Sequence, residues 1–421
     1  MNRWQDVLEL DVQVETLSGT AGLWDTAKWD RVDKWAGSPS TAGLMWLSIF
    51  DRVTDVSFQR GRKDLMSMTD TGTCQVDIIN DDGWASGQAP PEHQAPLVPG
   101  RRIRILARPA GTEAAFTALW TGYIDEVDAP WATRKTADAT LHGVDALSRL
   151  ALIDVPLPTA APREVYYDRL TRIVNMANFT HGTDFYIGTS LVIAASTIKQ
   201  NLLSEAQLAA WTAGQVLYAA RDGKLTTWPM GQGNYTYHYM LTNGTGAYGD
   251  GTWCPNLPIP YPGTAAEPIR NRIQLAHVNG GLHTYDHAQS QALYGLRPFV
   301  RTDLMGEEGT SIDTFGQGLL AHGAWPRYGN ATYDLDMPQA INLGPAINLA
   351  AIPLNAIIDV DLTIDPDEYP PWQSYKGATF VTAVHQSITD SRWNIAVTVD
   401  HPAGTAPVLP TALEELEPAW P

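Results

Sequence analysis

Segments in which apolar and polar residues alternate recur along most of this chain, with turn residues between them. VTDVSFQRGR, which begins at Val53, and RWNIAVTVD, which begins at Arg392, are two examples. A period of two places alternate side chains on opposite faces of a strand, whereas an amphipathic helix needs a period near 3.6. The cluster Asn80-Asp81-Asp82-Gly83 is typical of a turn, because Asn and Asp bond the local backbone and Gly adopts positive φ. The pattern predicts a mainly β protein.

The β segments fall into two groups. The first group, in residues 51–162, predicts five or six strands and a short final helix, as in an antiparallel barrel or sandwich. Its segments are VTDVSFQRGR, GTCQVDIINDDG, GRRIRILARP, FTALWTGYIDEVDAPW and TADATLHGVDALSRL. The second group, in residues 266–402, adds strands in IRNRIQLAHVNGG, ATYDLDM, AIIDVDLTI, ATFVTAVHQSI and RWNIAVTVD. This second unit also predicts a helical turn in AQSQALYGLR and a helix over 312–322 that ends at Gly323.

Residues 163–265 predict an α/β insertion between the two β units. Helical spacing relates Tyr167, Leu170, Ile173 and Val174. A second helix is predicted after Ser204, taken as its N-cap with Gln207 at the capping-box position. An Asp-Gly turn then opens a strand, and the Gly-, Tyr- and Asn-rich run over 231–262 predicts a long loop.

The two ends of the chain are predicted to be arms. Residues 1–50 form a Trp-rich N-terminal arm in which Trp24, Trp29 and Trp35 follow neither helical nor strand spacing. Large rings on an irregular segment need pockets in the same subunit or in a neighbour, or else form a local aromatic mini-core. Residues 403–421 are predicted as a C-terminal arm, since prolines flank one short acidic turn.

Charge and composition narrow the function classes. Charged residues make up 18% of the chain and the formal net charge is −18. A basic surface for nucleic acid or anionic membranes is therefore not expected, since phosphate neutralisation needs clustered Lys and Arg. No apolar run reaches the roughly 18 to 20 residues that span a bilayer, and the acidic start does not resemble an export signal. The low charge density favours a protein that assembles with partners, although a secreted globular protein with a polar surface is an alternative.

In their order along the chain, these segments resemble a known family. WDTAKWDRVDKW, VTDVSFQRGR, GTCQVDIINDDG, GRRIRILA and LWTGYIDEV are similar to the opening domain of tail-tip hub proteins (baseplate hub or minor tail proteins) of siphophages that infect actinobacteria. IRNRIQLAHVNGG, DHAQSQALYGLR and FVTAVHQSITDSRWNIAVTV are similar to the second half of that family. The resemblance implies a mainly β fold with an α/β insertion and two tail-tube-like β-barrel domains, as in phage baseplate hub proteins.

The same resemblance implies a function. The chain would be a structural virion protein: a homotrimeric hub at the distal tip of a long non-contractile tail, assembled in the host cytoplasm. Its implied partners are the distal tail or tail tube protein, the tape measure protein and other minor tail or fibre proteins. Genomic DNA would be only a passing cargo, and acidic side chains facing the channel would repel it and keep it mobile. Many hub proteins continue into a fibre, lysozyme-like or peptidase extension, whereas this sequence ends about 20 residues after its last predicted strand. Receptor binding and cell-wall cutting are therefore expected to belong to other subunits.

Catalytic and metal-binding patterns are weak, and we expect no enzyme activity, cofactor or metal site. His283 and His287 have i, i+4 spacing but lack the Glu of a zinc protease, which favours a surface pair. The acidic cluster of Asp361, Asp365, Asp367 and Glu368 is not an EF-hand loop and indicates a solvated turn more than a calcium site. Cys74 and Cys254 are expected to be free core thiols, with one disulfide as the alternative.

A carbohydrate-binding module or glycoside hydrolase is the alternative function. Many Trp and Tyr residues, turn-rich β units and scattered carboxylates also describe such proteins. A hydrolase needs two carboxylates about 5 to 10 Å apart. Asp125, Glu126 and Asp128 can supply one of them, but the sequence indicates no second. A distal ring subunit is a third interpretation, which the duplicated β unit disfavours.

The candidate contact residues are few. Trp24, Trp29 and Trp35 are predicted to anchor the arm on a neighbour. Four arginines are candidate intersubunit charge partners, with solvated strand ends as the alternative: Arg60, Arg62, Arg101 and Arg102.

Overall fold

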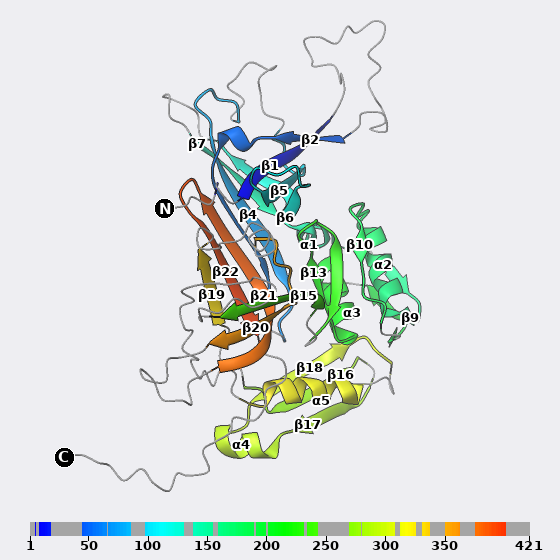
Figure 1. Cartoon of the computed structure of the whole chain (residues 1–421). Helices are drawn as coiled ribbons and strands as arrows, with labels where there is room; N and C mark the ends of the chain where they lie inside the picture. The colour runs from blue at the N-terminus through cyan, green and yellow to red at the C-terminus, as the bar shows by residue number, and fades with distance from the viewer. Residues whose placement is uncertain are drawn as a thin grey trace, which may run out of the picture.

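A large antiparallel sheet dominates the computed structural model of the protein, and smaller α/β units lie beside and below it in Figure 1. The structure describes residue 5 and residues 8–17, 44–64, 66–85, 97–129, 138–154, 159–188, 191–198, 201–230, 234–242, 269–278, 280–307, 312–325, 331–336, 350–362 and 375–400. The predicted mainly β class is confirmed.

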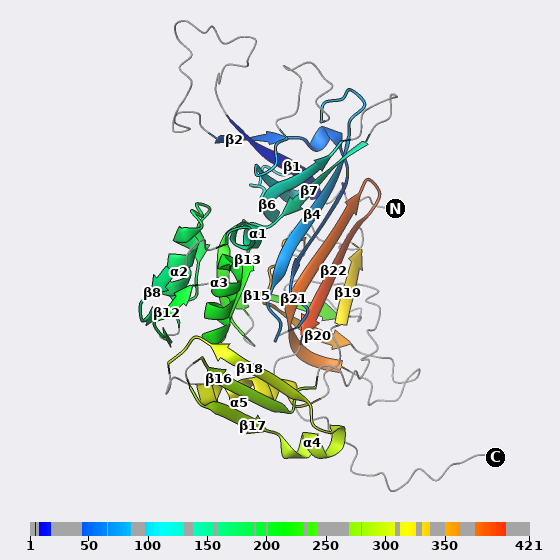
Figure 2. The same cartoon turned by 180° about the vertical axis from the view of Figure 1, so that it is seen from behind.

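The large sheet has 12 strands, in the order β15-β20-β21-β3-β4-β7-β6-β5-β1-β2, with β22 beside β21 and β19 beside β22. Its strands are β1 (Leu8–Leu17), β2 (Leu44–Ser48), β3 (Val53–Gly61), β4 (Asp70–Ile79), β5 (Arg102–Pro109), β6 (Thr117–Asp128), β7 (Asp138–Val144), β15 (Asn234–Thr242), β19 (Ala331–Asp336), β20 (Ala356–Leu362), β21 (Tyr375–Thr389) and β22 (Trp393–Asp400). Figure 2 shows the long strands β4, β21 and β22; β22 lies beside β21, and β3 separates β21 from β4. The predicted strands of both β groups are present in the large sheet, except that in IRNRIQLAHVNGG, which becomes β16 of a separate sheet.

The two predicted β units share this one sheet. β3 pairs antiparallel with β21, so that Ser57 lies opposite Ser387. Strands from opposite ends of the chain thus form the centre of the sheet. The prediction of a loop over 231–262 is wrong for β15, which pairs in parallel with β20. Its sequence, NYTYHYMLT, is rich in aromatic and β-branched residues, which favour a strand despite the turn residues around it.

Alternation along the strands builds one core. Val56, Val76 and Leu141 lie in register on β3, β4 and β7 and are at most 1% exposed. The core continues onto β1 and β5, and Val216, Tyr218 and residues 350–354 also belong to it. Strands of the first and of the second β group thus share a single apolar core.

The first α/β unit follows β7 and a short helix, α1 (Ala146–Ala151), capped by Asp145. It contains β8 (Thr159–Ala161), β9 (Glu164–Val165), α2 (Tyr166–Met176), β10 (Thr183–Asp184), β11 (Val192–Ile193), β12 (Ser196–Ile198), α3 (Leu202–Thr212), β13 (Gln215–Ala219) and β14 (Leu225–Pro229). The predicted helices and the strand after the Asp-Gly turn are confirmed. The predicted cap of α3 is wrong: Asn201 is the N-cap, and its side chain accepts a hydrogen bond from Ser204 N at 2.9 Å.

A second α/β unit lies within the range predicted as the second tube-like domain. Its three strands form a separate sheet in the order β17-β16-β18. The elements are β16 (Arg272–His277), β17 (Leu282–Asp286), α4 (Ala288–Tyr294), β18 (Pro298–Leu304) and α5 (Ile312–Gly323). β16 pairs in parallel with β18, which needs a long connection and cannot be read from local alternation. The predicted helix that ends at Gly323 is confirmed.

The structure describes only part of the two predicted arms. Residues 8–17 and 44–48 of the predicted N-terminal arm are strands β1 and β2 of the large sheet. The Trp-rich part, residues 18–43, lies outside the described residues, as does the predicted C-terminal arm at 403–421. In the described part of the chain, none of the helices is long and apolar enough for a membrane span.

Candidate functional site

Two rows of polar side chains cross the large sheet on the side away from its core. The first row joins Thr389, Asp55, Asp77, Thr140 and Asp128 on β21, β3, β4, β7 and β6. The second joins Asn394, Ser387, Ser57, Gln75, His142 and Glu126, beginning on β22. We call these two rows the polar face. None of the eleven residues is buried.

The polar face is acidic. It carries four carboxylates, Asp55, Asp77, Glu126 and Asp128, and neither Lys nor Arg stands in either row. Thr140 Oγ1 donates to Asp77 Oδ1 at 2.7 Å, and Gln75 Nε2 donates to the same carboxylate at 3.2 Å. Neutral donors thus orient Asp77 while leaving its negative charge in place. Such a surface repels phosphate groups rather than binding them.

Asp55 and Asp77 face each other directly across β3 and β4. Partial burial, and then the charge of Asp77, raise the pKa of Asp55 above its ordinary value. Like charges in directly opposed positions destabilise a sheet. The polar face therefore keeps an acidic pair at some cost in stability.

Replacing Asp55 with Asn is expected to raise the melting temperature slightly at pH 7. A raised folded-state pKa means that this carboxyl favours folding below its ordinary pKa of 3.8, and that the benefit is lost as pH rises through the raised value. Asp55→Asn should gain a few tenths of a kcal/mol at pH 7 and nothing near pH 3. Asp128→Asn, opposite Thr140, is the matched control and should show a smaller gain. Equal gains for both variants at pH 7 would refute the repulsion between Asp55 and Asp77.

A second polar surface lies on β1, β2 and β5, and we call it the charged ladder. Arg108 forms two hydrogen bonds with Glu9, from Nε to Oε2 at 2.8 Å and from Nη2 to Oε1 at 2.9 Å. Arg104 donates from Nε to Gln13 Oε1 at 2.8 Å. These pairs join directly opposed residues of β1 and β5. Unlike the polar face, the charged ladder carries both signs of charge.

The candidate arginines Arg101 and Arg102 lie at this surface. Arg102 Nη1 is 3.9 Å from Glu15 Oε1, and its guanidinium lies 5.1 Å from the ring centroid of Trp46. The guanidinium of Arg104 lies 3.9 Å from the centroid of the same ring. Arg101 is partly exposed, and its backbone N–H donates to Val98 O. A role for Arg101 and Arg102 in contacts between subunits stays a prediction.

The structure corrects the placement of Arg60 and Arg62, which are 5% and 4% exposed. Arg60 Nη2 donates to Ile352 O at 2.5 Å, and Arg62 Nη2 donates to Asn355 Oδ1 at 3.3 Å. Burial lowers the pKa of Arg62 to about 10, although the charge of Asp400 opposes the shift. Both arginines hold the segment around residues 350–355 on the sheet, so neither is a solvated strand end, and a role in contacts between subunits stays a prediction. The three candidate tryptophans, Trp24, Trp29 and Trp35, lie outside the described residues.

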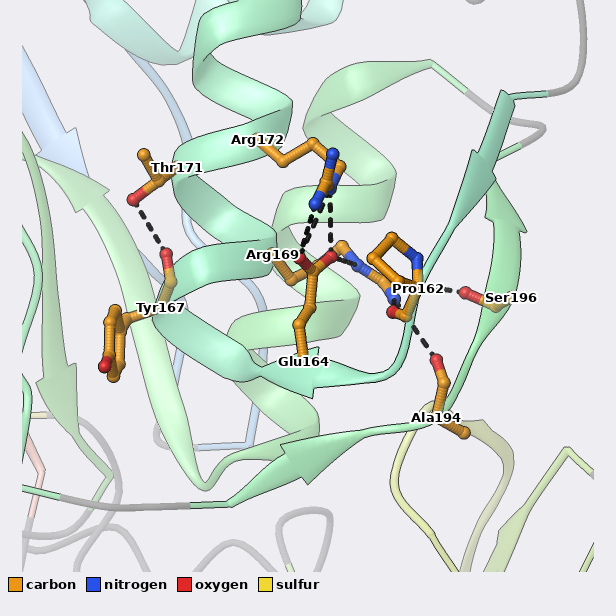
Figure 3. A network of polar contacts seen from close by, with 8 residues as sticks. All are labelled: Pro162, Glu164, Tyr167, Arg169, Thr171, Arg172, Ala194 and Ser196. Atoms are coloured by element: carbon orange, nitrogen blue, oxygen red, sulfur yellow. Dashed lines mark hydrogen bonds and ion pairs between the residues drawn. The ribbon is translucent and has the colours of Figure 1, made fainter.

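A buried charge network holds the first α/β unit together, as Figure 3 shows. The Arg169 side chain is 0% exposed and donates from Nε to Glu164 Oε1 at 2.6 Å. It also donates to Ser196 Oγ at 2.8 Å and to the carbonyls of Pro162 and Ala194 at 2.9 and 3.1 Å. Arg169 thus joins α2 to the strand segments around it. All these partners of Arg169 belong to the first α/β unit, so the network stabilises that unit internally.

The residues considered for metal binding or glycoside hydrolysis lie in different parts of the described structure. His283 Nδ1 lies 3.3 Å from Asp313 Oδ1, whereas His287 caps α4 by accepting from Ser290 N at 3.3 Å. Among the described residues, no group of three or more His, Cys, Asp or Glu side chains is arranged to hold a metal ion. Asp125, Glu126 and Asp128 are exposed at the end of β6. Of the acidic cluster at 361–368, only the backbone of residues 361 and 362 is described.

The two cysteines are not placed together by the described structure. Cys74 is a free, buried thiol on β4, and burial raises its pKa. Cys254 lies outside the described residues. The free core thiol is confirmed for Cys74.

Comparisons with known proteins identify the fold. No protein-family model matches the chain, and no curated protein matches it. The solved 43 kDa tail protein of prophage MuSo2 from Shewanella oneidensis is similar, with a TM-score of 0.54 and 11% identity over 94% of this chain and 99% of that one. The tail protein from Neisseria meningitidis MC58 has a TM-score of 0.56 and 9% identity over 94% of this chain and 96% of that one. Over nearly its whole length, the chain therefore shares its fold with two solved tail proteins, one of them from a prophage.

Proposed function

We propose that this chain is a structural subunit of a phage tail, a homotrimeric hub at the distal tip, and that it has no catalytic role. Two findings support the proposal. The fold is that of solved tail proteins over almost the full length of both chains. The sequence segments independently resemble tail-tip hub proteins of siphophages in their order along the chain.

The polar face is the main structural support for this proposal, because its chemistry is that expected for the wall of a DNA channel. DNA must pass the tail tip without being held, and a surface that neutralises phosphates would hold it. The two rows contain four carboxylates and no Lys or Arg across six strands. Carboxylates repel the DNA backbone, so a wall of this kind keeps the duplex mobile. In the proposed trimer, the polar faces of the three copies surround the channel.

The charged ladder suits a different part of the assembly. Arg108 is paired with Glu9 and Arg102 with Glu15, and Arg102 and Arg104 both stack on Trp46. Partly exposed Arg and Trp residues are favoured in contacts between proteins. We propose that this surface, with Arg101 and Arg102 at its border, meets another tail component. Tail tube, tape measure and other minor tail or fibre proteins are the proposed partners.

Reversing charge on the polar face tests the channel proposal in assembled particles. The double variant Glu126→Lys with Asp128→Lys should assemble normally but slow DNA release into host cells about tenfold or more, since lysines hold phosphates. The double variant Glu113→Lys with Asp154→Lys is the matched control, because it makes the same change in net charge at exposed positions outside the polar face. The measurement is the time course of DNA entry, followed with a DNA-binding dye in host cells.

The outcomes separate the proposal from its alternatives. Slow release for the polar-face variant alone supports a channel lining. Equal release rates for both variants would contradict it. Loss of particle assembly for the polar-face variant alone would place these residues in a contact between proteins. Soluble glycans that raise the melting temperature of the isolated chain would instead favour carbohydrate binding.

A further inference from the structure

Basic side chains gather around one tyrosine where the large sheet meets the first α/β unit. Tyr123 of β6 lies opposite Arg102 of β5. Helix α1 packs against β6, as Figure 1 shows, and places the Arg149 guanidinium 4.7 Å from the centroid of the Tyr123 ring. His181, which lies between α2 and β10, has its ring centroid 5.4 Å from that of Tyr123. We call Arg102, Tyr123, Arg149 and His181 the Arg–His cluster.

The Arg–His cluster holds more positive than negative charge. Arg102, Arg149 and Glu15 are the charged groups that act on the Tyr123 hydroxyl. Arg102 Nη1 lies 3.9 Å from Glu15 Oε1, which is an ion pair without a hydrogen bond. Arg149 is exposed, and among the described residues no carboxylate lies within ion-pair distance of it. Two guanidiniums thus face one carboxylate, and the cluster is one negative charge short.

Three donors of the cluster have no acceptor in the described part of the chain. Tyr123 is 5% exposed, yet its hydroxyl makes no hydrogen bond to the described residues. The same is true of the half-buried imidazole of His181 and of the Arg149 guanidinium. A polar group in such a place usually has a partner, because leaving it unpaired costs free energy. The three donors and the missing negative charge both indicate an anion.

The electrostatics of His181 agree with an anion site. Burial, and then the charges of Arg102 and Arg149, lower the pKa of His181 to about 4. The imidazole is therefore neutral at pH 7 and can donate one N–H without adding charge. Phe179 packs edge-on against this ring, with the two centroids 5.4 Å apart, and so helps to orient it. His181 is thus a positioned neutral donor between two guanidiniums.

We infer that the Arg–His cluster binds a carboxylate, supplied by an acidic side chain of a neighbouring tail subunit. One carboxylate brings the acceptor oxygens that Arg149 and Tyr123 lack, together with the missing negative charge. Glu15 lies beside Arg102 and repels a second negative charge, which favours a carboxylate over a phosphate dianion. The source of the carboxylate rests on the proposed role of the charged ladder, whereas the site itself does not.

An acetate titration at pH 7, followed by NMR of histidine-labelled protein, tests the site. The His181 signal is identified by its loss in His181→Gln. At constant ionic strength, acetate should move this signal along a saturating curve. Arg149→Gln should weaken acetate binding about tenfold, because it removes a charge-assisted hydrogen bond. Arg297→Gln is the matched control and should change nothing, since Arg297 is an exposed arginine between α4 and β18.

Tyr123→Phe guards against a variant that disturbs the fold. It keeps the ring beside Arg149 and removes only the hydroxyl, so acetate should bind several-fold more weakly. An acetate response of His181 that is absent, or that is as strong in Arg149→Gln as in the unchanged chain, would overturn the site. Tighter binding of inorganic phosphate than of acetate at the same ionic strength would overturn the choice of a carboxylate.

Charge reversal in phage particles tests the source of the carboxylate. Arg149→Glu should lower the yield of assembled tails about tenfold or more, because it places two carboxylates against each other, and Arg297→Glu should leave the yield unchanged. Equal yields for the two variants would overturn a neighbouring subunit as the source. Absence of the protein from phage tails would refute the proposed function, but it would leave the acetate result of the isolated chain unaffected.

Discussion

Replacing Arg169 with Met should destabilise the first α/β unit by about 3–5 kcal/mol. The Arg169 side chain is fully buried and donates to four acceptors: Glu164, Ser196 and the carbonyls of Pro162 and Ala194. Methionine fills much of the volume but donates nothing, so three acceptors and part of a carboxylate lose their partner inside the protein. The measurement is the urea midpoint of unfolding, together with hydrogen exchange of the amides of α2.

Arg172→Met is the matched control for this change. Arg172 contacts the same carboxylate, at 2.8 Å from Nη2 to Oε2, but its side chain is 41% exposed. An exposed ion pair contributes about 1 kcal/mol or less, so the control should lose far less stability. Equal losses for the two variants would contradict the account of the network.

The same network predicts a loss of stability in acid. Burial by itself raises the pKa of Glu164, but hydrogen bonds from Arg172 and Arg169 outweigh it, and the pKa lies below its ordinary value of 4.5. The contribution of ionised Glu164 to stability is therefore complete above pH 4.5 and is lost as pH falls through the lowered pKa of this carboxyl.

Replacing Trp120 with Ala should cost about 3–5 kcal/mol, because it empties a large site in the main core. Trp120 is 1% exposed, and its ring fits against two glycines of the sheet. A Cβ added at Gly122 would lie 2.3 Å from Trp120 Cη2, and one added at Gly143 would lie 3.0 Å from it. The ring and the two glycines thus form one packing unit.

Two further variants define this effect. Gly122→Ala should also be strongly destabilising, since the new Cβ would lie 2.3 Å from the backbone oxygen of Val144 as well. Trp46→Ala is the control on the same sheet, because Trp46 is partly exposed and stacks under Arg104. Losing that stacking should cost about 1 kcal/mol. A Trp120→Ala protein that unfolds in urea at the same midpoint as Trp46→Ala would refute the packing argument.

Local alternation predicts the strands well but not how they pair. RWNIAVTVD and VTDVSFQRGR become β22 and β3 as expected, because each buries alternate residues on one core. Nothing in either segment indicates that β3 pairs with β21 from the far end of the chain. The polar face depends on that pairing, so its residues could be predicted as outward-facing but not as one surface. Strand β1 is also predictable from the sequence, since apolar and polar residues alternate clearly in LELDVQVETL.

Single side chains show where sequence reasoning fails. Arg60 belongs to the same strand face as Val56 and Phe58, and its position in the alternation indicated burial. An arginine near a strand end is usually exposed, and that general tendency gave the wrong placement. Ser204 has the residue type of an N-cap, but Asn201 stands one turn earlier with a β backbone and takes that role. In both cases the tertiary contacts decide between two locally reasonable positions.

The most direct test of the central claim is an electron cryomicroscopy reconstruction of the tail tip of a phage that carries this protein. We expect three copies around the tail axis, with Asp55, Asp77, Glu126 and Asp128 lining the central channel. A reconstruction that places the protein along the tail tube would contradict the account. So would one in which the polar face points away from the channel and another protein lines it.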